Sequence, residues 1–240
     1  MIDFSIVIPI HNESGNLEQL IEQIRTVCAN NAYEVILVDD ASSDGSLAII
    51  ERLKYKYKQL RGFSHSKLAG QSAAVHTGVI HATADRVIIM DGDLQNDPAD
   101  IHRFLKCFDD HQSNNIGLVI GQRILRKDSM IRNLSSKIVN YTRRLILKDH
   151  TIDSACGFKL ISKKVFIELP YFNHMHRFMP ALVLRQGYQV INIPINHRPR
   201  VSGKSKYGIN NRLWVGIIDL FGVCWLSKRM KATGEIKESK

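Results

Sequence analysis

The chain has 240 residues, of which 44% are hydrophobic and 23% are charged, and its formal net charge is +10. This length and apolar content are enough to bury the core of a folded domain, so the composition excludes a disordered chain of low hydrophobicity. The charge is uneven, because residues 1–120 carry 10 Lys and Arg against 16 Asp and Glu, whereas residues 121–240 carry 23 against 7. A basic second half is typical of proteins that bind phosphorylated substrates, anionic membranes or nucleic acid.

Short apolar segments alternate with amphipathic ones along the first half of the chain. Runs of branched apolar residues predict strands at 4–10, 34–39, 86–90 and 116–120. Apolar residues at i, i+3 and i+4 spacing predict helices at 16–27, 46–53, 70–81 and 97–108. This alternation is typical of an α/β protein with a doubly wound, mostly parallel sheet and helices on both faces.

Polar residues follow three of these strands, and in such a sheet ligands bind beyond the carboxyl ends of the strands. Asp91 and Asp93 follow the strand at 86–90, with Gln95 two residues further on. Two carboxylates so close to a buried strand need positive charge beside them. Oxygen ligands of this kind favour Mg²⁺ or Mn²⁺, which often complete their shell with substrate phosphates. We therefore predict a metal and diphosphate site here.

The acidic residues after the second strand allow two interpretations. Asp39 and Asp40 suit hydrogen bonds to a base or ribose, and for Asp40 we favour a ligand. Asp44 and Gly45 belong to a Ser-Ser-Asp-Gly segment that is typical of a turn with a helix cap, which we favour for these two residues. The chain contains neither a GxGxxG nor a GxxxxGK[ST] motif, so it predicts neither the usual dinucleotide fold nor a P-loop.

Three motifs, in this order, resemble one known family. They are Ile-Val-Ile-Pro-Ile-His-Asn-Glu at 6–13, Val-Asp-Asp-Ala-Ser-Ser-Asp-Gly at 38–45 and Asp-Gly-Asp-Leu-Gln-Asn-Asp-Pro at 91–98. The chain resembles family 2 glycosyltransferases with the GT-A fold, and most of all the polyprenyl-phosphate sugar transferases, which include dolichol-phosphate mannose synthase and bacterial undecaprenyl-phosphate enzymes. Later segments agree with this resemblance, at 121–123, 132–136, 153–159 and 196–208.

The resemblance implies a role for each matching residue. It implies contacts to the nucleoside of a nucleotide-sugar donor from Pro9, His11, Glu13, Asp39 and Asp40. It implies metal and diphosphate binding by Asp91, Asp93 and Gln95. It implies binding of the donor and acceptor phosphates by Arg123, Arg132, Ser136, Arg198 and Lys204. The family more often has Tyr where this chain has His11, and a histidine can also pack against a base.

The basic residues suit a reaction that brings several phosphates together. The segment 198–212 has five Lys and Arg and no acid, and Gly203 and Gly208 within it favour a loop that folds over the bound donor, although a solvated basic surface is the alternative. By resemblance, the expected reaction is a metal-dependent, inverting transfer of a sugar from a UDP- or GDP-sugar to a polyprenyl phosphate, for cell-envelope glycan or glycolipid synthesis.

Other activities remain open. Transfer to a sugar hydroxyl, in polysaccharide or lipopolysaccharide assembly, would require a general base, and Asp153 is the first candidate. Asp153 can equally be structural, and for Gly157 and Phe158 we favour tight packing of a helix start against the sheet. A nucleotidyltransferase would share the fold and the metal. A nucleic-acid-binding module lacks any recognisable motif here, so nucleic acid is not an expected partner.

The C-terminal residues 213–226 are largely apolar but include Asp219 and are fewer than a membrane span requires. Their aromatic and flanking basic residues favour a helix that lies on an anionic leaflet, with a dimer or core helix as the alternative; these residues are Arg212, Trp214, Phe221, Trp225, Lys228, Arg229 and Lys231. A second amphipathic candidate is 131–147.

We divide the chain into a catalytic domain at 1–208 and an amphipathic helix with a polar tail at 209–240. Within the domain we expect residues 1–120 to bind the nucleotide sugar and residues 121–208 to bind the acceptor. Four dispersed cysteines without a CxxC pair, and an N-terminus that begins a strand almost at once, favour reduced thiols. We expect a peripheral protein on the cytoplasmic face of the membrane, with a membrane-protein partner or a homo-oligomer as a further option.

Overall fold

The computed structural model describes residues 1–111, 115–123, 147, 149, 151, 153, 154, 156–199 and 209–229, with the side chains of 209–215 and 217 left out. Its strands are β1 (Phe4–Ile10), β2 (Tyr33–Asp40), β3 (Leu60–His65), β4 (Arg86–Ile89), β5 (Ile116–Arg123), β6 (Lys159–Ser162) and β7 (Gln189–Ile195). Its α-helices are α1 (Leu17–Val27), α2 (Ser46–Lys56), α3 (Gln71–His81), α4 (Ile101–Asp110), α6 (Lys163–Glu168), α7 (Met179–Arg185) and α8 (Ile209–Arg229). Two short 3₁₀ helices are η1 (Pro98–Asp100) and η3 (Met175–Arg177).

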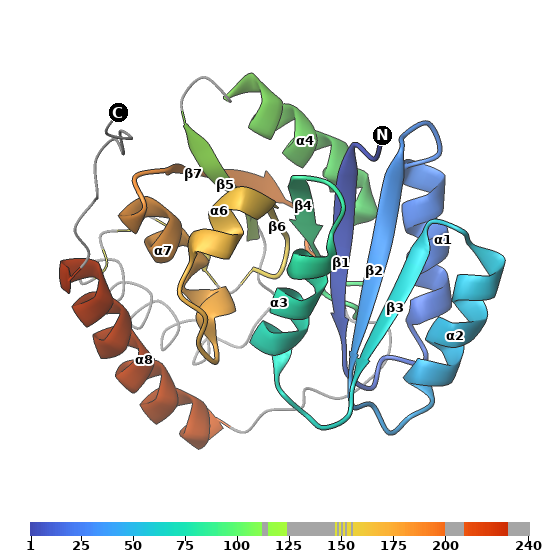
Figure 1. Cartoon of the computed structure of the whole chain (residues 1–240), viewed down its shortest axis with the longest axis horizontal. Helices are drawn as coiled ribbons and strands as arrows, with labels where there is room; N and C mark the ends of the chain where they lie inside the picture. Colours follow the sequence, from blue (N-terminus) through green and yellow to red (C-terminus); the bar gives the residue numbers. More distant parts are fainter. Residues whose placement is uncertain are drawn as a thin grey trace, which may run out of the picture.

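The seven strands form one sheet in the order β3-β2-β1-β4-β6-β5-β7. All neighbours are parallel except β6, which runs antiparallel to both β4 and β5. The predicted α/β fold with a mostly parallel sheet is therefore confirmed. The strands from the acidic first half and the basic second half share this sheet (Figure 1).

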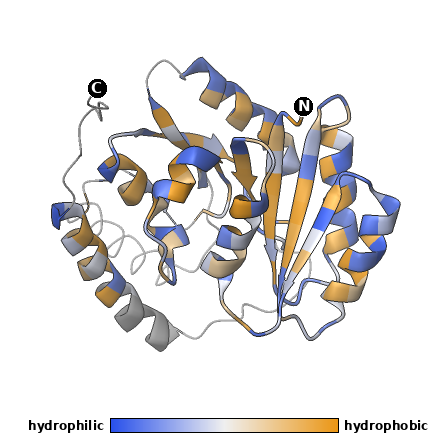
Figure 2. Ribbon diagram, viewed as in Figure 1, coloured by the Kyte–Doolittle hydropathy of each residue, from blue (hydrophilic) through white to orange (hydrophobic). Residues whose placement is uncertain are grey.

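Two layers of helices cover the sheet, because side chains alternate between its faces along each strand. Ile6 and Ile8 of β1 pack into a core with α1, α2 and α4. Val7, between them, points the other way into a core with α3, α6 and α7, to which Val223 of α8 also belongs. In Figure 2 the central strands are largely hydrophobic, while the helices show one hydrophobic and one hydrophilic side.

The predicted elements differ from the structure mainly at their ends. The helix expected at 97–108 begins with the η1 turn, since Pro98 lies at its start, and α4 follows from Ile101. The amphipathic segment expected at 213–226 is part of α8, which lies on the outside of the molecule beside α7 (Figure 1). The second candidate, 131–147, lies outside the described residues apart from Leu147. The four cysteines are free.

Candidate functional site

The carboxyl ends of β1, β2 and β4 meet at one edge of the sheet, because these strands are parallel neighbours. Since β6 runs antiparallel, the described residues before it, Asp153, Ser154, Cys156 and Gly157, lie at this same edge, and so do the ends of β5 and β7. In Figure 1 β1 and β2 run toward this edge at the bottom of the view. The topology therefore gathers most of the predicted site residues in one place.

The loops after β1 and β2 are tied together by hydrogen bonds. The backbone N–H groups of Asn12 and Glu13 donate to the hydroxyls of Ser42 and Ser46 at 2.9 and 3.0 Å. The Nδ1 of His11 donates to the backbone carbonyl of Asp40 at 2.8 Å. This hydrogen bond orients the His11 ring at the carboxyl edge of the sheet, directly after the end of β1, which contains Pro9.

Asp44 lies one residue before Gly45, the N-cap residue of α2, and its side chain accepts hydrogen bonds at the start of the helix, in agreement with the predicted turn and cap. Its Oδ1 accepts the backbone N–H of Ser46 at 3.0 Å and the Ser46 hydroxyl at 2.6 Å, while Oδ2 accepts the N–H of Ser14 at 3.0 Å. Burial acts to raise the pKa of Asp44, but these hydrogen bonds outweigh it and lower the pKa to about 2. Gly45 has φ +90°, a left-handed conformation that glycine adopts without strain.

Asp39 and Asp40 are both buried, but their carboxylates have different surroundings. Asp40 accepts three hydrogen bonds, from Nδ1 of His65 at 2.8 Å and from the backbone N–H groups of Ala69 and Gly70 at 2.9 and 2.7 Å. Asp39 accepts the N–H of Ser42 on Oδ2 at 3.1 Å, whereas its buried Oδ1 has no hydrogen-bond partner. A buried acceptor without a donor is costly, so Oδ1 of Asp39 is a candidate to accept a hydrogen bond from a ligand.

Asp91 lies where β4, α3 and the residues before β6 meet. Its Oδ1 accepts a hydrogen bond from Nε2 of Gln71 at 2.9 Å, and its backbone N–H donates to Oδ1 of Asn96 at 3.0 Å. A Cβ at Gly157 would lie 1.9 Å from its Oδ2. Gly157 is therefore needed for close approach to Asp91, and it precedes strand β6, not a helix as predicted. The neighbouring Phe158 packs as expected, buried and stacked 4.3 Å from Phe104.

The loop after Asp91 turns back sharply over the edge. Asp93 is buried and accepts the N–H of Gln95 at 3.2 Å. Leu94 between them has φ +62°, a strained conformation for a side chain of this type and one that is found at functional sites. The Nε2 of Gln95 donates to the carbonyl of Arg198 at 3.3 Å, which orients Oε1 as the atom of Gln95 that could bind a cation.

Electrostatics mark Asp91 as a group that needs positive charge. Burial and the neighbouring Asp93 raise the pKa of Asp91 to about 6, against the opposing effects of Lys159, Arg123 and Gln71. Lys159 is itself buried on β6, donates to the carbonyl of Cys156, and has a pKa lowered by that burial. A divalent cation would resolve the repulsion between the two carboxylates.

Arg123 and Asp153 form a two-point ion pair at the same edge. The Nε and a terminal nitrogen of the guanidinium donate to the two carboxylate oxygens at 2.5 and 2.7 Å. Burial acts to lower the pKa of Arg123, but Asp153 raises it. Both oxygens of Asp153 are thus already engaged by a cation.

Arg198 is brought beside the metal candidates by backbone pairing. Its N–H donates to the carbonyl of Gln95 at 3.0 Å, and an isolated bridge joins Asn96 to His197. Its guanidinium contacts Asp97 at 2.6 Å and Gln23 at 2.8 Å. Three further predicted phosphate ligands lie outside the described residues: Arg132, Ser136 and Lys204. Residues 200–208 of the segment 198–212, for which a loop was predicted, lie outside them too.

The sequence did not point to Gln71 or Lys159. A glycine directly before a helix at the carboxyl end of a strand was the available signal for Gln71, since Gly70 at φ +92° introduces α3. Lys159 offered no local signal, because its burial depends on the antiparallel placement of β6 between β4 and β5.

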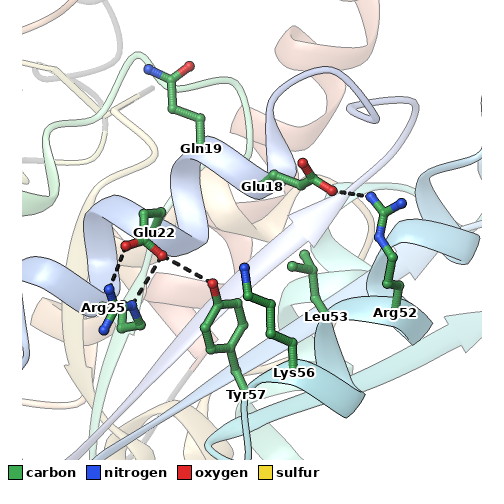
Figure 3. Close-up of a pocket in the computed structure, with 8 residues that line it drawn as sticks. All are labelled: Glu18, Gln19, Glu22, Arg25, Arg52, Leu53, Lys56 and Tyr57. Carbon is green, nitrogen blue, oxygen red and sulfur yellow. Dashed lines mark hydrogen bonds and ion pairs between the residues drawn. The ribbon is translucent and has the colours of Figure 1, made fainter.

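A separate groove of about 700 Å³ lies between α1 and α2. Figure 3 shows that the charged side chains lining it pair mainly with one another, through Glu22 with Arg25 and Tyr57, and through Glu18 with Arg52. Since these charges are largely satisfied within the groove, it does not compete with the sheet edge as the functional site.

The sequence of residues 5–170 matches the family described as glycosyl transferase family 2. The chain is 31% identical over 235 residues to dodecaprenyl-phosphate galacturonate synthase from Rhizobium johnstonii, covering 95% of this chain and 68% of the relative. It is 30% identical to undecaprenyl-phosphate 4-deoxy-4-formamido-L-arabinose transferase from Aeromonas hydrophila, covering 85% of this chain and 63% of that protein. The chain therefore spans about two thirds of the length of these relatives.

Solved structures share the fold at low sequence identity. Glucosyl-3-phosphoglycerate synthase from Mycobacterium tuberculosis, in complex with Mn²⁺, UDP-glucose and phosphoglyceric acid, has a TM-score of 0.69 at 14% identity, covering 97% of this chain and 81% of that one. The mannosyltransferase PcManGT from Pyrobaculum calidifontis, in complex with GDP-mannose and Mn²⁺, has a TM-score of 0.68 at 19% identity, covering 95% and 65%. The fold is that of GT-A glycosyltransferases, and the chain belongs to glycosyl transferase family 2.

Proposed function

We propose that this glycosyltransferase moves a sugar from a nucleoside diphosphate sugar to a polyprenyl phosphate, with a divalent cation and with inversion at the anomeric carbon. Both curated relatives are named for sugar transfer to a prenyl phosphate. The observation that carries the proposal is the pair of carboxylates Asp91 and Asp93, next to Gln95, at the same edge of the sheet as the buried Asp39.

Asp39 supports recognition of the nucleoside. Its buried Oδ1 has no donor from the protein, and both uracil and guanine carry ring N–H groups that could supply one. We assign Asp40 a structural role, because its carboxylate already accepts hydrogen bonds from His65, Ala69 and Gly70. His11 and Glu13 follow β1 at the same edge, and we propose both as contacts to the nucleoside.

The residues at the end of β4 fit Mg²⁺ or Mn²⁺. Asp91, Asp93 and Gln95 offer oxygen ligands, and burial together with Asp93 raises the pKa of Asp91 to about 6, which a cation beside it would counteract. No group of three or more His, Cys, Asp or Glu side chains suited to a metal is found among the described residues, so phosphate oxygens would complete the shell. When bound, the cation would neutralise charge on the departing nucleoside diphosphate.

The acceptor determines whether a protein base is needed. A phosphate monoester is ionised near neutral pH, so it can attack the anomeric carbon directly, from the face opposite the leaving diphosphate. Asp153 holds the guanidinium of Arg123 with both oxygens, which makes it poorly suited to accept a proton. This pairing supports a phosphate acceptor over a sugar hydroxyl, and Arg123 remains a predicted phosphate ligand.

The outer face of α8 supports contact with an anionic membrane surface. Ile218, Phe221 and Trp225 are 69%, 65% and 59% exposed, and their spacing places them on one side of the helix. Lys228 and Arg229 follow at its end, with Arg229 5.9 Å from the Trp225 ring. No helix within the described part of the chain has the length and apolar character to cross a membrane.

The activity is tested with purified protein, Mn²⁺, a panel of UDP- and GDP-sugars, and undecaprenyl phosphate in vesicles. We expect one nucleotide sugar to yield a glycosylated lipid phosphate, with the anomeric configuration inverted when the product is analysed by NMR. Undecaprenol without phosphate serves as the control acceptor and should remain unmodified. Transfer to undecaprenol, or to a sugar hydroxyl in place of the lipid phosphate, would contradict the proposal.

The membrane contact has its own test, cosedimentation with vesicles that contain anionic lipids. Trp225→Ala should weaken binding, since an interfacial aromatic side chain is lost. Tyr55→Ala is the matched control, because Tyr55 is 91% exposed but lies on α2, away from α8. Equal binding by wild type and Trp225→Ala would count against the α8 surface.

A further inference from the structure

The first turn of α3 joins the candidate metal site to the segment 173–177. Gln71, its first residue, donates to Oδ1 of Asp91 at 2.9 Å. Ser72, the next residue, is only 1% exposed, and its Oγ lies 2.7 Å from Nδ1 of His176. The same oxygen accepts the backbone N–H of His176 at 3.3 Å. Adjacent residues of one helix therefore contact Asp91 on one side and His176 on the other.

The chemistry of a serine hydroxyl fits both contacts. A hydroxyl has one hydrogen and two acceptor positions, so Ser72 can accept the backbone N–H of His176 while sharing its own hydrogen with Nδ1. A buried hydroxyl without such partners would be costly. The two contacts fix the rotation of the first turn of α3, and with it the direction in which Gln71 points.

The partner segment is itself held in place. Met175, next to His176, is buried in the core, and Nδ1 of His174 donates to Oδ2 of Asp219 on α8 at 3.1 Å. On the other side, Asn173 reaches the start of α3, since a Cβ at Gly70 would lie 3.4 Å from its Oδ1. His176 is thus presented to Ser72 by a segment that is anchored independently of their contact.

Asp91 depends on such support for its orientation. The Oδ2 of its carboxylate rests against the backbone of Gly157, and the described side-chain donor to Oδ1 is Gln71. Carboxylates that bind metals are usually held by hydrogen bonds from neighbouring residues, and loss of such a neighbour typically costs ~10–100-fold in metal affinity or activity. A rotation of α3 would move the amide of Gln71 away from Asp91.

We propose that Ser72 and His176 are positioning residues, which hold Gln71 against Asp91 and so keep that carboxylate oriented for a divalent cation. This inference rests on the proposed function only for the identity of the cation site. It adds two residues that touch neither the cation nor the reacting atoms. Their effect reaches the site through Gln71.

The experiment measures Mn²⁺ affinity by electron paramagnetic resonance, in the presence of UDP or GDP, for the full chain and its variants. Ser72→Ala and His176→Ala should each weaken Mn²⁺ binding by roughly tenfold. His176→Asn should restore most of this affinity, because an asparagine amide can place a polar atom close to the position of Nδ1. His176→Gln should not, because its amide extends to the position of Nε2.

His76→Asn is the matched control. His76 lies on the same helix and contacts Tyr171, with ring centroids 4.5 Å apart, but it does not touch the Ser72 pair in the described contacts. We expect its Mn²⁺ affinity to equal that of the wild type. Urea unfolding of all variants checks that affinity is compared among folded proteins, and the His176→Asn and His176→Gln pair keeps the comparison informative if an alanine variant is unstable.

Unchanged Mn²⁺ affinity in Ser72→Ala and His176→Ala would overturn the inference. So would an equal loss in His76→Asn, or in both His176→Asn and His176→Gln, since each would show a general structural effect. Sugar transfer is assayed separately. A wild-type protein that binds Mn²⁺ with nucleotide but transfers no sugar would refute the proposed function, while the order of affinities among the variants would still decide the inference.

Discussion

Two strands of this sheet end in closely spaced aspartates, and the two pairs have different environments. At the end of β2, the carboxylate of Asp40 receives hydrogen bonds from His65, Ala69 and Gly70. At the end of β4, Asp91 receives one from the neutral amide of Gln71, and its pKa is raised to about 6 by burial and by Asp93. The protein itself stabilises the Asp40 carboxylate, whereas we propose that a cation stabilises the Asp91 carboxylate.

Donors supplied from distant parts of the chain decide whether a carboxylate at a strand end is structural or free to bind a ligand. Asp40 and Gly70 are 30 positions apart, and Gln71 and Asp91 are 20 apart. A carboxylate with enough internal donors contributes to folding stability, whereas one without them is available for a ligand at the expense of stability.

The largest effect is expected for Asp91→Asn. Removal of the charge should lower the rate of sugar transfer by roughly 10²–10³-fold, since electrostatic stabilisation of the leaving diphosphate is lost. The melting temperature without metal should not fall, because the repulsion with Asp93 is relieved. Activity assays and calorimetry measure the two quantities. An Asp91→Asn variant with wild-type activity would contradict the proposed role of Asp91 in binding the cation.

Asp40→Asn should show the opposite pattern. An amide would face donors that now bind a carboxylate, and breaking such a buried network costs about 3 kcal/mol of unfolding free energy. Urea denaturation measures this loss, with Asp91→Asn as the control of equal chemistry. If Asp40→Asn were as stable as the wild type but failed to bind nucleotide, Asp40 would be a ligand and not a structural residue.

Asp39→Asn tests whether Asp39 differs in role from its neighbour Asp40 at the end of β2. We expect about tenfold weaker binding of the nucleoside diphosphate, because the acceptor at Oδ1 is replaced by a donor. The stability should change little, since Ser42 can still donate to the remaining oxygen. Titration calorimetry with UDP and with GDP provides the measurement. Nucleotide affinity equal to that of the wild type would remove Asp39 from the site.

The smallest effect is expected at Asp44, a third acid near the end of β2. Asp44→Ala should lose about 1 kcal/mol of stability at pH 7, the typical value for a helix cap. Because the folded-state pKa of Asp44 is about 2 against an ordinary value of 3.8, its contribution is complete above pH 3.8 and is lost as the pH falls through 2. The difference from the wild type should therefore shrink in acid.

Chemical denaturation at pH 7 and below pH 3 measures this difference. Asp110→Ala, at an exposed acid at the end of α4, is the control. A loss at Asp44→Ala that is the same at both pH values would show that the side chain acts by packing and not by its charge.

The strand and helix alternation of the first half could be predicted from the sequence, because branched apolar runs and helical spacing report burial directly. The strands β3 and β6 could not. β3 carries Arg61 and Ser64 at the edge of the sheet, so it lacks an apolar run. β6 has only four residues and includes the buried Lys159, whose charge argues against a central strand.

The candidate site could be predicted where a motif lies within one loop and not where it depends on packing. Asp91, Asp93 and Gln95 follow one strand, and the cap at Asp44 is local, so both could be read from the sequence. The internal donors to Asp40 and the pairing of Arg123 with Asp153 join distant segments, and no local pattern reports them. The same holds for the contact between Ser72 and His176, which are 104 positions apart.

The most direct test of the account is anomalous diffraction at the manganese edge from crystals grown with MnCl₂ and UDP or GDP. We predict an anomalous peak beside the carboxylates of Asp91 and Asp93, with the nucleotide diphosphate against it and the base near Asp39. A bound nucleotide at another part of the molecule, or a manganese ion held without either aspartate, would contradict the central claim.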